Sequence, residues 1–118
     1  MDYSSAHQLA RVIRESEEYR TYHTLKDEVM GDEATAAMIR EYRRLQISLQ
    51  MSAMSGQEAE SADVQRFSAL SSLLFANPAV SQFLLAEMRL QQALADIFKI
   101  VTEAADVETG MPDFGTVG

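Results

Sequence analysis

The chain contains no cysteine, no tryptophan, only two prolines and only five glycines among its 118 residues. The lack of cysteine excludes disulfides, thiol nucleophiles and cysteine-ligated zinc or iron–sulfur sites. No apolar run approaches the roughly 18 residues that a membrane-spanning helix needs. The first five residues, MDYSS, show neither the basic start nor the apolar stretch of a secretory signal. We therefore expect a cytoplasmic protein with no membrane insertion.

Basic residues are also scarce, with 10 against 18 acidic ones, so the formal charge is −8. Nucleic acids and anionic membranes attract basic surfaces, so direct nucleic acid binding is disfavoured. Hydrophobic residues make up 47% of the chain, which is enough for a core. We expect a single all-helical domain over residues 1–109 and a disordered tail over 110–118.

The few helix breakers divide a pattern that is otherwise helical throughout, and no stretch alternates as a strand does. At Ser16 the sequence allows either two helices or one bent helix, since serine is a good N-cap residue. Asp32 is a second good cap, and Asn77-Pro78 pairs a preferred cap with the favoured first helical residue. The predicted helical segments are about 5–30, 32–54, 63–76 and 78–109.

The last segment is long for so small a chain. About thirty residues form a rod of roughly 45–48 Å, whereas a compact body of this chain length is roughly 35 Å across. The fold class that follows is all-α: an elongated antiparallel helical hairpin or bundle of four to five helices with a long C-terminal helix. Because an exposed apolar stripe favours association, we expect a homo-oligomer, a dimer or higher.

One face of this segment carries the main candidate residues for an interface or for structure. Glu87 interrupts the apolar stripe, and a half-buried carboxylate needs a partner. A tyrosine (19, 22 or 42) or Arg43 is a possible partner. A general acid or base at Glu87 is one interpretation, but we favour a structural contact, because no nucleophile or second carboxylate accompanies it. The stripe is Phe83, Glu87, Leu90, Leu94, Ile97 and Val101.

Outside the stripe, Met51 and Met54 lie near the end of a predicted helix and are further interface candidates, since methionine suits adaptable surfaces. Arg40, Arg43 and Arg44 form either a small basic patch for RNA or a solvated helix face, and we favour the solvated face.

His7 and His23 are expected to be exposed, because they lack the spacing of metal ligands. With no phosphate loop and no catalytic triad in the sequence, we expect neither an enzyme nor a bound cofactor or metal.

Two stretches resemble the YlbF/YmcA family of small bacterial regulators. The first runs over residues 9–19, LARVIRESEEY, and continues with Tyr22, Met38-Ile39 and Tyr42. The second begins at Asn77-Pro78 and runs over 77–90, NPAVSQFLLAEMRL, followed by Leu94, Ile97 and Ile100. The resemblance covers about residues 5–102.

The resemblance implies a self-associating, non-enzymatic, all-helical protein of the Gram-positive cytoplasm. It further implies a role, through other family members or regulatory proteins, in competence, sporulation, biofilm formation and mRNA processing. Some complexes of such proteins carry iron–sulfur clusters on cysteines, which this chain cannot supply. A helical chaperone or export-related adaptor is the alternative function.

Overall fold

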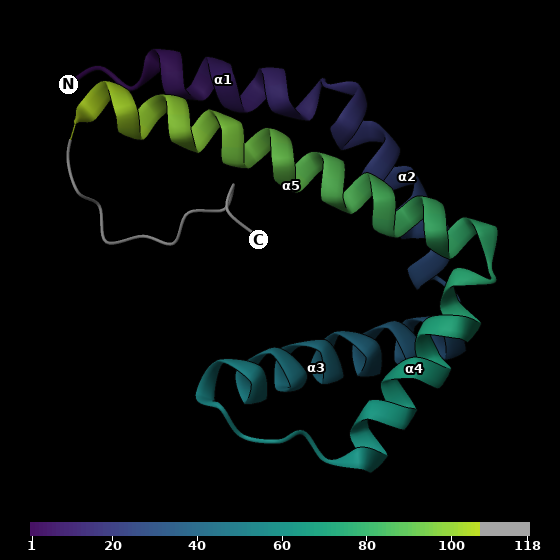
Figure 1. Cartoon of the computed structure of the whole chain (residues 1–118). Helices are drawn as coiled ribbons and strands as arrows, with labels where there is room; N and C mark the ends of the chain where they lie inside the picture. The colour runs from purple at the N-terminus through teal and green to yellow at the C-terminus, as the bar shows by residue number, and fades with distance from the viewer. Residues whose placement is uncertain (107–118) are drawn as a thin grey trace. The chain divides into compact units, whose positions relative to one another are not determined.

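The computed structural model describes residues 1–106 and contains no β-strand in that range. Figure 1 shows the chain as a succession of α-helices joined by short breaks. The predicted all-α fold with a long last helix is confirmed. The predicted tail at 110–118, and the last residues of the predicted helix 78–109, lie outside the described residues. Within residues 1–106 the helices are α1 (Ser4–Arg14), α2 (Glu17–Met30), α3 (Glu33–Ser55), α4 (Ser61–Phe75) and α5 (Pro78–Ala105).

Side-chain caps explain why the first helices end where they do. The Oγ of Ser16 accepts a hydrogen bond from the Tyr19 amide at 3.2 Å and donates one to the Ile13 carbonyl at 2.6 Å. Serine thereby ends α1 and begins α2, so two helices form rather than one bent helix. Asp32 caps α3 in the same way, and its carboxylate accepts from the Thr35 amide at 3.4 Å.

The Asn77-Pro78 pair starts the longest helix, as predicted. The Asn77 Oδ1 accepts a hydrogen bond from the Ala79 amide at 3.0 Å, and Pro78 occupies the first helical position. From there α5 continues without a break for 28 residues, a length of about 42 Å at 1.5 Å per residue. Helix α4 begins at Ser61, two residues before its predicted start, because the Val64 amide already bonds to the Glu60 carbonyl.

The chain divides into two compact units. We call residues 25–83 the central unit, and residues 1–24 with those from 84 onward the terminal unit. The division falls within α2 and within α5, so each of these helices contributes to both units. The single domain predicted for residues 1–109 remains a prediction, because the division into two compact units does not test it. Each unit is described by itself below.

The central unit is built on a hairpin of α3 and α4. Its most deeply buried side chains include Ile39 on α3 and Leu70 on α4, both with no exposed surface. The ring of Tyr42 stacks on that of Phe67 with centroids 5.0 Å apart. Next to this stack, the Arg66 guanidinium donates two hydrogen bonds to the Glu41 carboxylate, at 2.8 and 3.0 Å. Apolar burial and one bidentate ion pair therefore join the two helices.

The terminal unit combines α1, the first part of α2 and most of α5. Figure 1 shows α1 running beside α5 in this unit. The side chains buried here are small, namely Ala86 and Ala95. Small side chains let helices approach closely but bury little apolar area. Within residues 1–106, no single helix is long and apolar enough to cross a membrane, and α4 and α5 meet that test only when they are taken together across their bend.

Candidate functional site

The predicted stripe lies on one face of α5, because its residues are spaced by four or three positions along the helix. Its exposure changes along the helix. Phe83, in the central unit, is only 1% exposed, and the middle residues Glu87, Leu90 and Ile97 are half-buried. Leu94, which lies between Leu90 and Ile97, is 43% exposed, and Val101 near the C-terminal end is 55% exposed. Phe83 is therefore part of the core, whereas the end of the stripe is available to other molecules.

Three more apolar side chains on α5 are exposed although they lie off the stripe. Ile100 is 67% exposed, and Leu85 and Met88 are also open to solvent. A period of 3.6 residues selects one face of a helix, so it could not indicate these positions. In the sequence, only the high apolar content of the segment could have indicated that these three residues are exposed. The exposed apolar surface of α5 is thus wider than the predicted stripe.

Glu87 is half-buried, as its place in the stripe suggested. Of the tyrosines considered as its partners, Tyr19 and Tyr22 both contact His23. The His23 ring lies 4.2 Å from that of Tyr19 and 5.0 Å from that of Tyr22. These contacts leave His23 half-buried, so the expectation of an exposed histidine was wrong there and right for His7.

The predicted methionines lie at the C-terminal end of α3, in the central unit. Met51 is 65% exposed and Met54 is 87% exposed. Met51 borders an open hollow of about 450 Å³. Ile47, which was not a candidate, is also exposed and lines the hollow together with Met51. The remaining lining residues are Arg44, Ser48, Ser52, Ser55 and Gln57.

The arginines of α3 do not act as one patch. Arg43 lies over the ring of Phe83, 5.8 Å from its centroid, which is the geometry of a cation–π contact. Arg40 and Arg44 are exposed. The hydrogen bond from Arg66 lowers the pKa of Glu41, and this pair neutralises the charge of one further arginine in the central unit. A solvated face with one packing arginine fits better than an RNA-binding surface.

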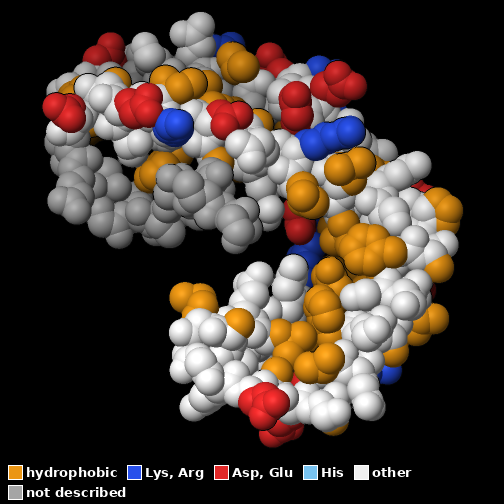
Figure 2. Space-filling view, in the orientation of Figure 1, with side chains coloured by type: hydrophobic (Ala, Val, Ile, Leu, Met, Phe, Trp, Pro, Cys, Tyr) orange, Lys and Arg blue, Asp and Glu red, His pale blue; other side chains and the backbone are white. Residues whose placement is uncertain are grey.

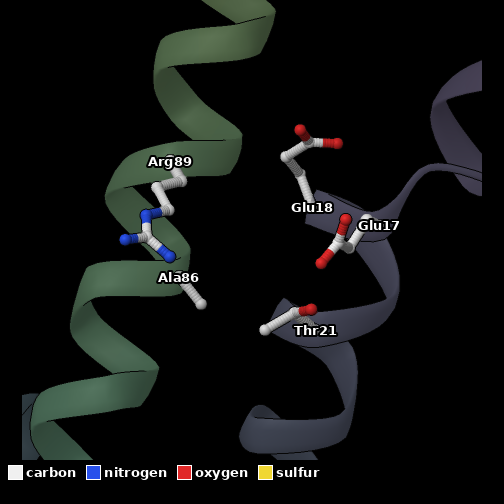
Figure 3. Close-up of a pocket in the computed structure, with 5 residues that line it drawn as sticks. All are labelled: Glu17, Glu18, Thr21, Ala86 and Arg89. Carbon is white, nitrogen blue, oxygen red and sulfur yellow. The ribbon is translucent and has the colours of Figure 1, made fainter.

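A second recess, of about 230 Å³, lies within the terminal unit between α2 and α5. Figure 3 shows Glu17, Glu18 and Thr21 on α2 facing the side of α5 that carries Ala86 and Arg89. The two carboxylates lie in the first turn of α2, where the helix dipole favours negative charge. Stabilisation of the N-terminus of α2 therefore accounts for the position of these two carboxylates.

In residues 1–106, no group of three or more histidine, aspartate or glutamate side chains is placed to hold a metal ion. The recess between α2 and α5 is lined by carboxylates, a threonine, an alanine and an arginine, without a histidine or lysine. The described residues include many exposed apolar side chains, several of them on α3 and α5.

The chain is similar to a described protein family and to other proteins. Residues 3–105 match the family model described as "Control of competence regulator ComK, YlbF/YmcA". The chain is 33% identical over 109 residues to a UPF0342 protein of Caldicellulosiruptor saccharolyticus, covering 92% of this chain and 91% of the relative. It is 36% identical over 99 residues to a UPF0342 protein of Halothermothrix orenii, covering 84% of each.

A solved structure shares the fold. It is titled "Protein of Unknown Function (DUF964) from Bacillus stearothermophilus" and aligns with a TM-score of 0.68. The alignment covers 88% of this chain and 91% of the other, at 20% sequence identity. At that identity the likeness concerns the fold alone.

Proposed function

The chain belongs to the YlbF/YmcA family, and we propose that it is a non-enzymatic regulatory module that acts by binding protein chains. In this proposal it self-associates in the cytoplasm and also binds other family members or regulatory proteins. Through them it influences competence, sporulation, biofilm formation and mRNA processing. The family description links its members to competence regulation. The binding role and the partners are our proposal.

The proposal rests mainly on the solvent-exposed apolar side chains near the C-terminal end of α5. Toward its C-terminal end, Leu94, Ile100 and Val101 are each at least 43% exposed. Exposed apolar side chains gathered on one helix are typical of a surface that another protein covers. Fully burying such a side chain is worth about 1.5–3 kcal/mol. Three of them therefore supply a useful part of a binding free energy once a partner covers them.

Charged side chains surround these apolar residues. Asp96, Lys99 and Glu103 are exposed on the same part of α5. Lys99 and Glu103 form only a long contact of 4.0 Å, and both remain largely open to solvent. Alternating charges around an apolar centre are the usual rim of a specific interface. Such a rim discriminates among partners more than it adds affinity.

Affinity capture from the native host tests the proposal, with the wild-type chain and two variants as bait. The variant Ile100→Glu/Val101→Glu places carboxylates on the apolar end of α5. The control Gln91→Glu adds one carboxylate at an exposed position earlier on the same helix. Wild type and control should retain regulatory proteins or proteins of mRNA processing, and the double variant should lose them.

Two results would count against this function. Equal capture by all three baits would remove α5 from the binding surface. Capture of unfolded or secreted clients in place of regulatory proteins would favour a helical chaperone or export-related adaptor. A host strain that lacks the chain should also show altered competence, sporulation or biofilm formation, and unchanged behaviour in all three would contradict the regulatory role.

A further inference from the structure

The end of the α3–α4 hairpin differs from the rest of the central unit in having no buried side chain. The buried residues of α3 stop at Leu45, and those of α4 begin at Leu70. Between these two positions every described residue is half-buried or exposed. Figure 2 shows hydrophobic side chains gathered over α3 and α4. The hairpin end therefore presents apolar side chains that the central unit does not itself cover.

This region also includes a long stretch without charged residues. Residues 45–57, LQISLQMSAMSGQ, contain no aspartate, glutamate, lysine or arginine. They include the exposed Ile47, Met51 and Met54, and they supply all but one of the residues that line the open hollow of about 450 Å³. For a chain of net charge −8, such a face is where a second copy approaches with the least repulsion. The same face offers no direct charge contact to a strongly charged partner.

Charges return at both ends of this stretch, with opposite signs. Arg44 lies just before it, on the wall of the hollow, and Glu58 lies just after it in the loop. Both residues are seven positions from Met51, one toward the N-terminus and the other toward the C-terminus. If two copies of α3 lie antiparallel about a two-fold axis at Met51, each Arg44 lies at the end of the contact where the other copy carries Glu58, in the loop that follows Gly56. A parallel arrangement would bring like charges together instead.

We infer that residues 44–58, the C-terminal part of α3 and the start of the loop after it, bind the same residues of a second copy in antiparallel orientation, with Met51 at the two-fold axis. The inference rests on the proposed function, which includes self-association, and names the surface that carries it. A two-fold contact is self-complementary by definition. Here the complementarity consists of methionine and isoleucine side chains against the serine-lined hollow, with an arginine–glutamate pair at each end.

Light scattering after size exclusion gives the first test. The mass that light scattering gives for the wild-type chain should be twice the monomer mass of 13.2 kDa. Met51→Glu places two carboxylates together at the axis and should return the mass to that of the monomer, with an unchanged helical circular dichroism spectrum. Ile100→Glu is the matched control, because Ile100 is 67% exposed and Met51 is 65% exposed. The control should remain a dimer.

The outcomes separate this inference from the proposed function. A wild-type chain that stays at 13.2 kDa at every concentration overturns both the self-association and this surface. A wild-type dimer that persists in Met51→Glu overturns the surface alone. A dimer that is lost in Ile100→Glu and kept in Met51→Glu assigns self-association to α5 and also overturns this inference.

The absence of cysteine allows a second test that does not depend on weakening the dimer. A disulfide needs two Cα atoms within about 7 Å, so a single cysteine reports contact with its own copy. Met51→Cys should form a covalent dimer under mild oxidation on a non-reducing gel, and Ile100→Cys should not. Failure of Met51→Cys to cross-link in a chain that is dimeric by light scattering would contradict an axis at this residue.

Charge exchange tests the antiparallel orientation. Arg44→Glu or Glu58→Arg alone should weaken the dimer by about two- to thirtyfold in dissociation constant, because two exposed pairs are lost. The double exchange Arg44→Glu/Glu58→Arg should restore the wild-type value. Equal weakening by the double variant would overturn the pairing of these two residues.

Discussion

Replacement of Phe83 tests which part of the α5 stripe belongs to the core. Phe83 is 1% exposed, and truncating a buried phenylalanine to alanine costs about 3–5 kcal/mol. A domain of this size is stable by about 5–15 kcal/mol in total, so Phe83→Ala removes a large share of its stability. With a urea dependence of about 2 kcal/mol per molar, the unfolding midpoint should fall by about 2 M.

Phe83→Leu keeps the fold measurable if the alanine variant does not fold. Leucine retains most of the apolar volume, so this change should cost only about 1 kcal/mol. It also removes the ring beneath Arg43, whose guanidinium lies 5.8 Å from the ring centroid. A double-mutant cycle with Arg43→Met should give a coupling of about 0.5–1 kcal/mol.

Urea unfolding followed by circular dichroism measures each of these differences. Val101→Ala is the control on the same stripe, because Val101 is 55% exposed and its truncation should change stability by less than about 0.5 kcal/mol. If Phe83→Ala and Val101→Ala had equal small effects, the burial of Phe83 would be refuted. The distinction between a covered and an open end of the stripe would then fail as well.

Substitutions at three other positions test local features. Gly56 ends α3 at a φ of +74° with no atom within 4 Å of an added Cβ, so Gly56→Ala should cost about 1 kcal/mol through backbone strain alone, and Gly56→Asn less, by urea unfolding. Asn77→Ala removes the acceptor for the Ala79 amide at the start of α5 and should cost about 1 kcal/mol by the same assay; no loss would contradict this cap. The Arg66 hydrogen bond lowers the pKa of Glu41 from 4.5, so its stabilising effect is complete above pH 4.5 and is lost as the pH falls through the lowered value. Arg66→Met should therefore flatten the dependence of stability on pH below 4.5 in acid titrations; an unchanged slope there would show that the pair does not affect folding.

The helices were largely predictable because their signals are local. Ser16, Asp32 and Asn77 each accept hydrogen bonds from amides two or three residues further along the chain. Such contacts depend on a few neighbouring residues and not on the rest of the fold. The position of Pro78 and the continuity of α5 follow from the same kind of information.

The candidate surfaces were only partly predictable. Periodicity identified the α5 stripe as a face but could not separate the buried Phe83 from the exposed Val101, since both lie on it. Met51 and Met54 were identified by residue type and by their place near a helix end. The exposure of Ile47 was not predicted, because an isoleucine in a helix can equally well be a core residue or a surface residue.

The sequence by itself determined the all-helical fold, most helix boundaries and the absence of cysteine chemistry, because these depend on neighbouring residues or on composition. The tertiary structure alone decided which apolar residues are covered. It also paired Glu41 with Arg66, which are 25 residues apart, and left the end of the α3–α4 hairpin without a buried residue. Burial and long-range pairing depend on which helices pack together, and the periodicity of a single helix carries no information about its neighbours.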